Sequence, residues 1–445
     1  MTRQLGQFSR RVFVKGVSAA VAGSWILPNS RSAWSYQANE RLNLAIIGAG
    51  RRGQANLEAV TGENIVVICD VDERRAAHSF AMYPQAKKYH DYRRLLDEMD
   101  REVDAVVVST PNHHHAPASV MAMRRGKHVY CEKPGAHSVY EARLATEVAA
   151  EQQVATQLGT QCHSSAIFRQ MVDIIREGVI GEVREFHAWQ RTGGRGGRGD
   201  RPTETLPVPE GLDWDLWLGP APYRPYHPVY SNGHMWWDFG GGVLGNNGCH
   251  YFDPAFAALE LGTPESIEAE GPPPHPESTP NQQHVRYHFP ARRTMPPVTL
   301  TWTHGAEGPA IFMEHPFPVW RDPDPSPWGV FVGSEGMLLV SYAQWRLWPE
   351  EKYADYQPSQ LDPEPDPAAW YSADHHAEWI AACKKGSATS CHFGYSGPIT
   401  EAVLLGNVAY RSAAKLEWDA AGFEVTNVPE ANESLRRDYR AGWTL

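Results

Sequence analysis

The stretch LNLAIIGAGRRG, residues 42–53, decides the fold of this chain. Its apolar run is followed by Gly48, Gly50 and Gly53, and this spacing is typical of the turn between the first strand and helix of a dinucleotide-binding domain. Glycines there let the backbone approach a pyrophosphate, and the helix amino terminus offers unpaired N–H groups to it. The stretch therefore predicts an α/β Rossmann domain.

Residues 65–70, IVVICD, supply the second part of that pattern. Asp70 ends an apolar run about twenty residues after the glycines, where a carboxylate accepts hydrogen bonds from the ribose of a dinucleotide. The same carboxylate disfavours a 2'-phosphate, so the cofactor is predicted to be NAD rather than NADP. Arg51, Arg74 and Arg75 lie close enough in sequence to weaken that preference.

Strand and helix signals continue to alternate as far as residue 158. Apolar runs at 104–110 and 128–131 indicate strands, and 116–125 and 139–152 have helical character. This alternation predicts a doubly wound parallel sheet, and we assign residues 42–158 to it.

Two polar clusters, TPNHHH (110–115) and EKP (132–134), follow predicted strands. Ligands of such sheets bind beyond the carboxyl ends of the strands. We predict no metal site, because three adjacent histidines on a loop point apart, and we expect this loop to pack near the cofactor. The residues predicted to bind the cofactor are Gly48, Gly50, Arg51, Arg52, Gly53, Asp70, Thr110, Pro111, Asn112, His115, Glu132 and Lys133.

From residue 181 the pattern changes to longer strands, at 182–190 and 298–302, separated by loops rich in Gly and Pro. It predicts an α+β domain with an open, mainly antiparallel sheet, assigned to residues 159–445. The length of 445 residues agrees with two domains. The formal net charge of -11 argues against a general nucleic-acid binder, and six cysteines without a CxxC pair argue against a zinc ribbon or disulfide framework.

Residues 1–34 have a different character. Arg10 and Arg11 precede a modestly apolar run at 16–27, which is the pattern of a twin-arginine (Tat) export signal. That run is too short for a permanent membrane anchor, so we expect a periplasmic or otherwise extracytoplasmic mature protein without an anchor. The alternative is a chance pair of arginines in an unstructured tail.

From residue 42 to its end the chain resembles the Gfo/Idh/MocA oxidoreductases, in particular their exported, Tat-dependent branch. The resemblance implies a two-domain enzyme whose second sheet forms the floor of the substrate site and often a dimer interface, so we expect a homo-oligomer, a dimer or a tetramer. The segments that carry the resemblance are GAGRRG (48–53), STPNHHHAP (109–117), EKP (132–134), GTQCHSS (159–165), LDWDLWLGPAP (212–222), GGG (240–242) and YSGPITEAVLLGNVAYR (395–411).

The resemblance also implies catalytic roles. Lys133 would lie beside the nicotinamide and the reacting hydroxyl, and the acid/base of the family pattern D-x-G-x-H-x-x-D falls on His250. On a helix, positions 246 and 250 share a face, but this chain has Asn246 where the family has a carboxylate. Asn246 can orient a group but cannot take up a proton, so proton transfer rests on His250, Lys133 or water. Asp253 is either the partner of His250 or a structural cap.

Aromatic side chains cluster ahead of the glycine segment, and aromatic faces stack on sugar rings as well as filling cores. The better candidates for lining the sugar site lie in a Pro-rich stretch that is predicted to be a loop: Tyr223, Tyr226 and Tyr230, with His227 and His234. His375 and His376 could reach the cleft or only hold the carboxyl-terminal segment, on a helix capped by Asp374. The residues predicted to contact substrate are His163, Tyr230, Trp237 and Asp253.

Three functions remain open from the sequence. The first is an oxidoreductase that transfers a hydride between tightly held NAD and a hydroxyl of a sugar or sugar derivative. The second is a glycosidase or lyase that works by transient oxidation, elimination, hydration and re-reduction. The third is an inactive sugar-binding protein that retains NAD, for which Asn246 is the main support. The sequence alone identifies no residue that selects the sugar, its anomer or the position that is oxidised.

Overall fold

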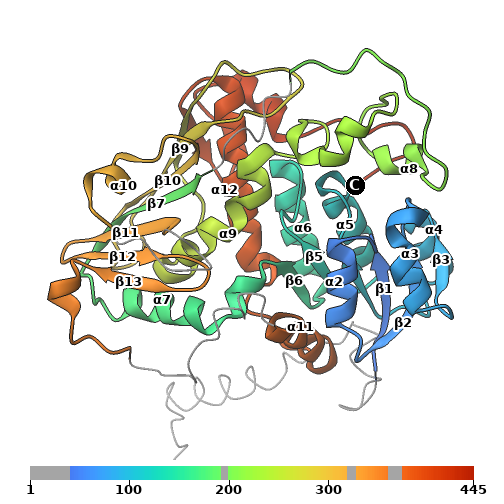
Figure 1. Cartoon of the computed structure of the whole chain (residues 1–445), viewed down its shortest axis with the longest axis horizontal. Coiled ribbons are helices and arrows are strands. Elements are labelled where there is room, and N and C mark those ends of the chain that lie inside the picture. The colour runs from blue at the N-terminus through green and yellow to red at the C-terminus, as the bar shows by residue number, and fades with distance from the viewer. Residues whose placement is uncertain (1–40, 192–198, 318–326, 359–372) are drawn as a thin grey trace, which may run out of the picture.

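The computed structural model describes residues 41–191, 199–317, 327–358 and 373–445. The predicted export signal therefore lies outside the described residues. Two sheets, joined by long helices, divide the described chain into an amino-terminal and a carboxyl-terminal domain (Figure 1).

The amino-terminal domain is the predicted doubly wound sheet. Six strands, all parallel, have the order β3-β2-β1-β4-β5-β6. The chain adds β2 and β3 on one side of β1, and β4, β5 and β6 on the other. The strands are β1 Asn43–Ile47, β2 Asn64–Cys69, β3 Lys87–Tyr89, β4 Ala105–Val108, β5 His128–Glu132 and β6 Thr156–Gly159. The helices are α2 Arg52–Ala59, α3 Glu73–Met82, α4 Tyr92–Glu98, α5 His115–Arg124 and α6 Val139–Gln152.

Helix α6 has the predicted bounds because its start is specified locally. Ser138 accepts a hydrogen bond from the Glu141 amide, and the Glu141 carboxylate accepts one from the Ser138 amide, which is a capping box. The central strand β4 is buried along its whole length and β1 is buried after its first residue, as expected for a sheet covered on both faces.

The carboxyl-terminal domain contains a nine-stranded sheet with the order β13-β12-β11-β7-β10-β9-β8-β14-β15. Among its described strands only the neighbours β7 and β10 run parallel, so the prediction of a mainly antiparallel sheet is confirmed. The strands are β7 Val183–Arg191, β8 Ser266–Glu270, β9 Gln283–Phe289, β10 Val298–Gly305, β11 Gly329–Gly333, β12 Met337–Val340, β13 Trp345–Trp348, β14 Leu416–Asp419 and β15 Glu424–Val425.

Two long helices link this sheet to the Rossmann domain. Phe252 of α9 packs edge-on against Tyr287 of the sheet, and Gly248 lets α12 approach closely, since a Cβ there would lie 2.7 Å from Val403. The helices of this part are α7 Ala166–Arg176, α8 Trp214–Leu218, α9 Gly242–Leu259, α10 Ala310–Glu314, α11 Ala373–Lys385 and α12 Phe393–Ser412. No helix within the described ranges is long and apolar enough to cross a membrane.

One helix of the carboxyl-terminal part, α11, packs on the first domain, although the sequence assigned residues 159–445 to the second. Trp379 and Cys383 of α11 join the core of the Rossmann domain beside Leu42 and Leu44. The helix begins at Ala373, so Asp374 lies in its first turn and is not its cap. The chain thus returns to the first domain at α11 before it adds β14 and β15 to the second sheet (Figure 1).

Candidate active site

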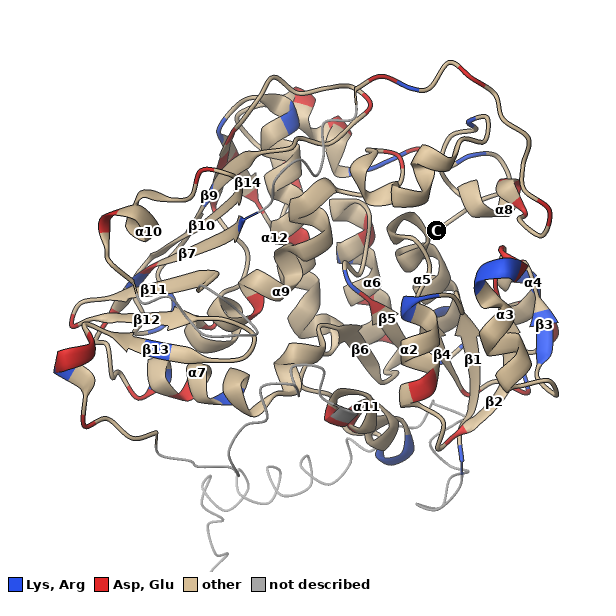
Figure 2. Ribbon diagram, viewed as in Figure 1, with Lys and Arg blue, Asp and Glu red and all other residues tan. Residues whose placement is uncertain are grey.

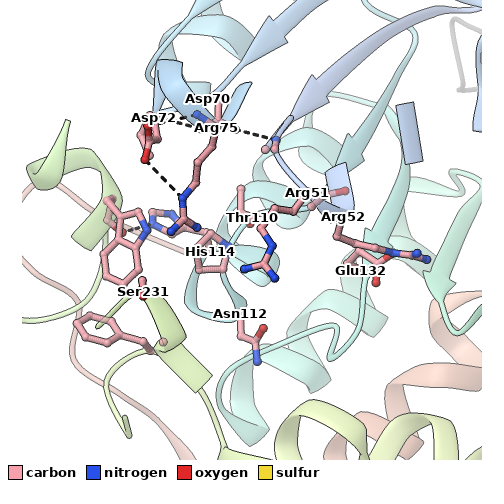
Figure 3. A pocket seen from close by; sticks show the side chains of 18 of the residues that line it. Arg51, Arg52, Asp70, Asp72, Arg75, Thr110, Asn112, His114, Glu132 and Ser231 are labelled. Carbon is pink, nitrogen blue, oxygen red and sulfur yellow. Dashed lines mark hydrogen bonds and ion pairs between the residues drawn. The ribbon is translucent and has the colours of Figure 1, made fainter. Parts of the chain in front are cut away.

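A cavity of about 900 Å³ lies at the carboxyl edge of the parallel sheet, between the two domains. This is where ligands of doubly wound sheets bind. One end is lined by the glycine-rich turn and the end of β2, and the other by Lys133 and the face of α9 that carries Asn246 and His250. Figure 3 shows part of the first end, with Arg52 turned toward Glu132 and away from Arg75.

The glycines of the first end are required by the chain itself. Gly48 has a φ of +84°, and a Cβ there would lie 2.7 Å from the Ser109 carbonyl group. A Cβ on Gly53 would lie 1.9 Å from the Gly48 oxygen. The turn therefore lies flat against the end of β4 and leaves space in front of the amino terminus of α2, which fits a dinucleotide pyrophosphate.

Asp70 lines this end of the cavity and also fixes the turn. Its Oδ2 accepts hydrogen bonds from the amides of Ala49 (2.7 Å) and Gly50 (3.3 Å), and its Oδ1 accepts one from the Asp72 amide. Burial raises the pKa of Asp70, and these amides oppose that rise. Asp72 pairs with Arg74 at 2.8 Å.

Arg75 also pairs with Asp72, at 3.6 Å. Because both arginines already have an anionic partner, they are less available to a 2'-phosphate than their positions in the sequence suggest.

The histidine cluster holds the loops around the cavity together. His115 does not line the cavity: its ring bridges the carbonyl oxygens of Thr110 (2.7 Å) and Pro134 (2.6 Å). His113 and His114 both contact the Trp217 carbonyl oxygen, and their rings lie 4.4 Å apart. The expectation that adjacent histidines point apart was wrong for this pair, because the segment folds as a 3-10 helix.

Thr110, Pro111 and Asn112 do line the cavity, as predicted. The Thr110 hydroxyl and the Asn112 amide nitrogen are buried and have no hydrogen-bond partner in the described chain. Both polar atoms are therefore available to a ligand. No group of His, Cys, Asp or Glu in the described ranges is arranged to hold a metal ion.

Glu132 is the centre of a buried polar network beneath the cavity. Its Oε1 accepts from Arg52 (2.8 Å), Asn56 (3.0 Å) and Gln161 (2.9 Å). Burial alone would raise the pKa of Glu132, but Arg52 and these hydrogen bonds hold that pKa below its ordinary value. Gly159 makes room for the carboxylate, since a Cβ there would lie 2.8 Å from it. The network ties β5 to α2.

Lys133 follows Glu132 at the end of β5 and reaches across the domain boundary. Its Nζ donates to the main-chain oxygen of Asn246 at 2.7 Å. Burial lowers the pKa of the Lys133 ammonium, and the Glu132 carboxylate only partly opposes this. A lowered pKa makes the Lys133 ammonium a better proton donor than an ordinary lysine.

His250 lines the same end of the cavity from α9, one turn after Asn246. Burial and the nearby charge of Lys133 lower the pKa of His250 to about 3, so its ring is neutral at physiological pH. Its Nδ1 has no partner in the described chain. The Asn246 amide donates to Asn247 at 3.1 Å. The structure thus brings the three predicted catalytic residues together.

The four predicted substrate residues are not among the described residues that line the cavity. His163 donates to the Asp253 carboxylate at 2.9 Å, and the Tyr395 hydroxyl donates to the same carboxylate at 2.5 Å. Asp253 therefore has His163 and Tyr395 as its side-chain partners, and no hydrogen bond joins it to His250 in the described chain. Tyr230 and Trp237 are buried in the core.

Other residues form the wall in their place. Tyr226, His227 and His234 line the cavity, and their loop position was the signal that pointed to them. Tyr342 and Trp443 also line it, and no local signal in the sequence distinguishes them from other aromatic residues. Sequence periodicity predicts which side chains are buried only within regular helices and strands. Tyr342 lies just after a strand and Trp443 near the end of the chain, so periodicity does not apply to them.

His375 and His376 hold the carboxyl-terminal segment and do not line the cavity. The His375 ring contacts the Leu158 carbonyl oxygen at 2.8 Å, and the His376 ring contacts Asn56 at 3.2 Å. This was one of the two alternatives that the sequence left open.

Two family models match the chain, and together they cover more than half of it. "Oxidoreductase family, NAD-binding Rossmann fold" matches residues 42–160, and "Oxidoreductase family, C-terminal alpha/beta domain" matches residues 180–294. The chain belongs to the Gfo/Idh/MocA oxidoreductase family. Its Rossmann domain is of the NAD-binding type.

Curated relatives of this Gfo/Idh/MocA protein include two kinds of enzyme. A glycosyl hydrolase family 109 protein of Stenotrophomonas maltophilia is 26% identical over 250 residues, 51% of this chain and 52% of the relative. The inositol 2-dehydrogenase of Salmonella typhimurium is 31% identical over 154 residues, 33% of this chain and 45% of the relative. The matches thus span about half the length of these relatives.

Solved structures of the same fold include GenD2 from gentamicin A biosynthesis in complex with NAD, with a TM-score of 0.58 and 16% identity. That match covers 89% of this chain and 100% of GenD2. Levoglucosan dehydrogenase in complex with NADH and levoglucosan has a TM-score of 0.58 and 16% identity, over 85% of this chain and 99% of its own. The likeness confirms the two-domain fold.

Proposed function

We propose that this protein is an NAD-dependent oxidoreductase that acts on a hydroxyl of a sugar or sugar derivative. One observation carries the proposal: Lys133 and His250 come from different domains, line the same end of the cavity and both have lowered pKa values. Relatives and structural neighbours named as inositol and levoglucosan dehydrogenases support the substrate class.

The residues divide the chemistry as follows. Gly48, Gly50 and Asp70 line the cavity and would hold NAD, which when bound accepts a hydride from a carbinol carbon. Gly53, which was predicted to bind the cofactor, packs against Gly48 and does not line the cavity. His250 is neutral and can accept the hydroxyl proton at a ring nitrogen, with Lys133 as the second proton-transfer group. Asn246 has no proton to exchange and can only orient the substrate or neighbouring side chains.

Substitution of the two proton-transfer groups tests this proposal. A general acid or base contributes about a hundredfold to ten-thousandfold in rate, so His250→Ala and Lys133→Ala should each lose that much turnover with NAD content unchanged. His304→Gln is the matched control: His304 is also buried with a pKa of about 4, but it does not line the cavity. Normal turnover of either alanine variant would remove that residue from the mechanism.

Net glycoside cleavage is the second candidate, and the glycosyl hydrolase family 109 relatives favour it. Oxidation of a ring hydroxyl to a ketone acidifies the neighbouring C–H, so that His250 or Lys133 can remove that proton while the glycosidic oxygen departs. Addition of water and return of the hydride then restore the sugar. Release of the aglycone without accumulation of NADH would distinguish this reaction from net oxidation.

We also propose that the cofactor is held tightly. A segment that we call the strap, residues 206–217, crosses the end of β2: the Glu73 amide donates to Gly211 and the Asp213 amide donates to Val71, both at 2.8 Å. Leu212 and Trp214 of the strap line the cavity. These contacts would slow the release of NAD.

Residues near the carboxyl terminus also close over the cofactor end of the cavity. Arg437 donates to the His113 carbonyl oxygen at 2.6 Å, and Trp443 lines the cavity while its ring contacts Tyr92.

Export by the Tat pathway is part of the proposal, on the evidence of residues 9–15, SRRVFVK. A folded enzyme that leaves the cytoplasm with its NAD has no nicotinamide pool outside, so the cofactor would have to be regenerated in place. Replacing Arg10 and Arg11 by lysines should keep the protein in the cytoplasm, as fractionation and immunoblotting would show. Unchanged export of that variant would contradict the proposal.

We propose further that the protein is a homo-oligomer. On β9 the side chains of Val285 and Tyr287 face the core, while His284, Arg286 and His288 are half-buried on the opposite face of the sheet. A second copy on that face would cover them. Sedimentation of a single monomeric species at micromolar concentration would contradict this.

A further inference from the structure

The charge at the substrate end of the cavity is not balanced by the protein. The Lys133 ammonium donates to a neutral partner, the main-chain oxygen of Asn246 at 2.7 Å. The neighbouring Glu132 carboxylate already accepts hydrogen bonds from Arg52, Asn56 and Gln161. In Figure 2, Lys and Arg mark the start of α2, close to the end of β5.

The other carboxylates that line the cavity are also engaged. Among the described lining residues these are Asp70, Asp72 and Asp91, at the end of β2 and the start of α4. Asp70 accepts three backbone amides, Asp72 pairs with two arginines, and Asp91 pairs with Arg93 at 2.6 Å. None of these carboxylates is left to neutralise Lys133.

Asn246 occupies the position from which a side chain could have done so. Its main chain contacts Lys133, its side chain lines the cavity, and it precedes His250 by one helical turn. An amide there adds no negative charge, so the single Glu132 carboxylate is shared between Arg52 and Lys133 and one positive charge remains in excess. The lowered pKa of Lys133 agrees with this, because burial disfavours the charged form more than the shared Glu132 carboxylate favours it.

We infer that the substrate supplies the missing negative charge: the site takes a carbohydrate that carries a carboxylate, such as a uronic or aldonic acid, and Asn246 selects for it. The inference rests on the proposed function, because it assigns the substrate class of the same site. A carboxylate beside a partly buried ammonium gains a charge-assisted hydrogen bond. A side-chain carboxylate at position 246 would repel it.

A single carboxylate matches this site better than a phosphate does. One ammonium balances one negative charge, whereas phosphate recognition usually recruits the forked donors of arginine. The other donors that line the cavity include amides: Asn112, whose Nδ2 has no partner in the described chain, and Asn247.

Calorimetric titration of the NAD-loaded protein tests the inference without relying on turnover. The probes are matched sets with gluco and galacto configuration: the methyl glycoside, its methyl glycuronide and the sugar 6-phosphate, together with gluconate and galactonate. For wild type we expect a carboxylated probe to bind at least about tenfold more tightly than its neutral counterpart. Asn246→Asp should remove that preference by weakening only the carboxylated probe. Asn246→Ala, which adds no charge, should keep it.

Every other outcome overturns the inference. Equal or tighter binding of the neutral glycoside, tighter binding of the phosphate, no binding of any carboxylated probe, or an equal effect of Asn246→Asp on both probes would each contradict it. The redox state of the bound cofactor tests the proposed function separately. If neutral sugars alone bind and reduce the bound NAD, the inference fails while the proposed function stands. If the glycuronide binds without any redox change of the cofactor, the inference stands while the proposed function fails.

Discussion

Asp70 illustrates how one residue can serve two purposes at the cofactor end. Its carboxylate was predicted to select NAD, and in the structure it also accepts the Ala49 and Gly50 amides. Asp70→Ala would therefore disturb the glycine turn as well as cofactor choice. Asp70→Asn removes the charge and keeps an acceptor oxygen for the Ala49 and Gly50 amides, at the loss of the acceptor for the Asp72 amide, so it disturbs the turn less than alanine does.

We expect Asp70→Asn to weaken NAD binding by about tenfold or more and to weaken NADP binding much less, because the repulsion of a 2'-phosphate is lost with the charge. Calorimetry on protein stripped of nucleotide measures both affinities. Arg75→Ala serves as a control for the neighbouring cation. An equal loss for the two nucleotides would remove Asp70 from cofactor selection.

The residue scale also marks the limit of prediction from sequence. Asn246 and His250 could be predicted because helical spacing places them on one face of α9, and Lys133 because it belongs to the EKP motif. Tyr230 and Trp237 could not be separated from core aromatic residues, because burial there depends on the packing of a loop without regular periodicity. The role of Asp253 could not be predicted either, because its partner His163 is ninety residues distant in sequence.

At the scale of elements, the strap should control how long the protein retains NAD. Asp213→Pro removes the N–H that donates to Val71, and the backbone φ of -85° at this position is close to that of proline. Asp213→Ala keeps this N–H and loses only the side-chain cap on Leu216, so it is the matched control.

Asp213→Pro should release NAD at least about tenfold faster than Asp213→Ala, because one of the two backbone anchors of the strap is lost. The measurement is the rate of nucleotide loss after dilution into a scavenging dehydrogenase. Identical release rates for the two variants would show that the strap does not enclose the cofactor.

Most elements of the first sheet could be predicted, since β1, β4 and β5 are apolar runs and α6 has a capping box. The position of α11 could not be predicted from the sequence. Its residues Trp379 and Cys383 complete the core of the Rossmann domain from more than three hundred residues away, and no local pattern indicates which sheet such a helix covers.

For the whole molecule we expect stability to depend steeply on pH. Seven described histidines have pKa values lowered by burial to about 3 or 4: His114, His128, His137, His250, His304, His375 and His376. In the unfolded chain they titrate near 6.5, so the unfolded state binds more protons below that pH. The free energy of unfolding should therefore fall as pH decreases from about 6.5 toward 4.

The expected result is acid unfolding between about pH 5.5 and 4, measured by circular dichroism at constant ionic strength. His304→Gln removes one of these protonation sites and should move the midpoint to lower pH, provided that the variant folds with the wild-type Tm at pH 7.5. A midpoint below about pH 3, or a Tm that is constant from pH 7 to 4.5, would contradict the burial of these rings.

The most direct measurement follows the redox state of the cofactor inside the intact protein. Protein purified without added nucleotide is mixed with a panel of sugars, glycosides and sugar acids, and the absorbance of bound NADH is recorded before and after gel filtration. We predict that the preparation contains NAD(H), that a carbohydrate reduces the bound NAD in wild type but not in His250→Ala, and that the nucleotide stays with the protein. A preparation that arrives without nucleotide, or whose cofactor no carbohydrate reduces, would contradict the account.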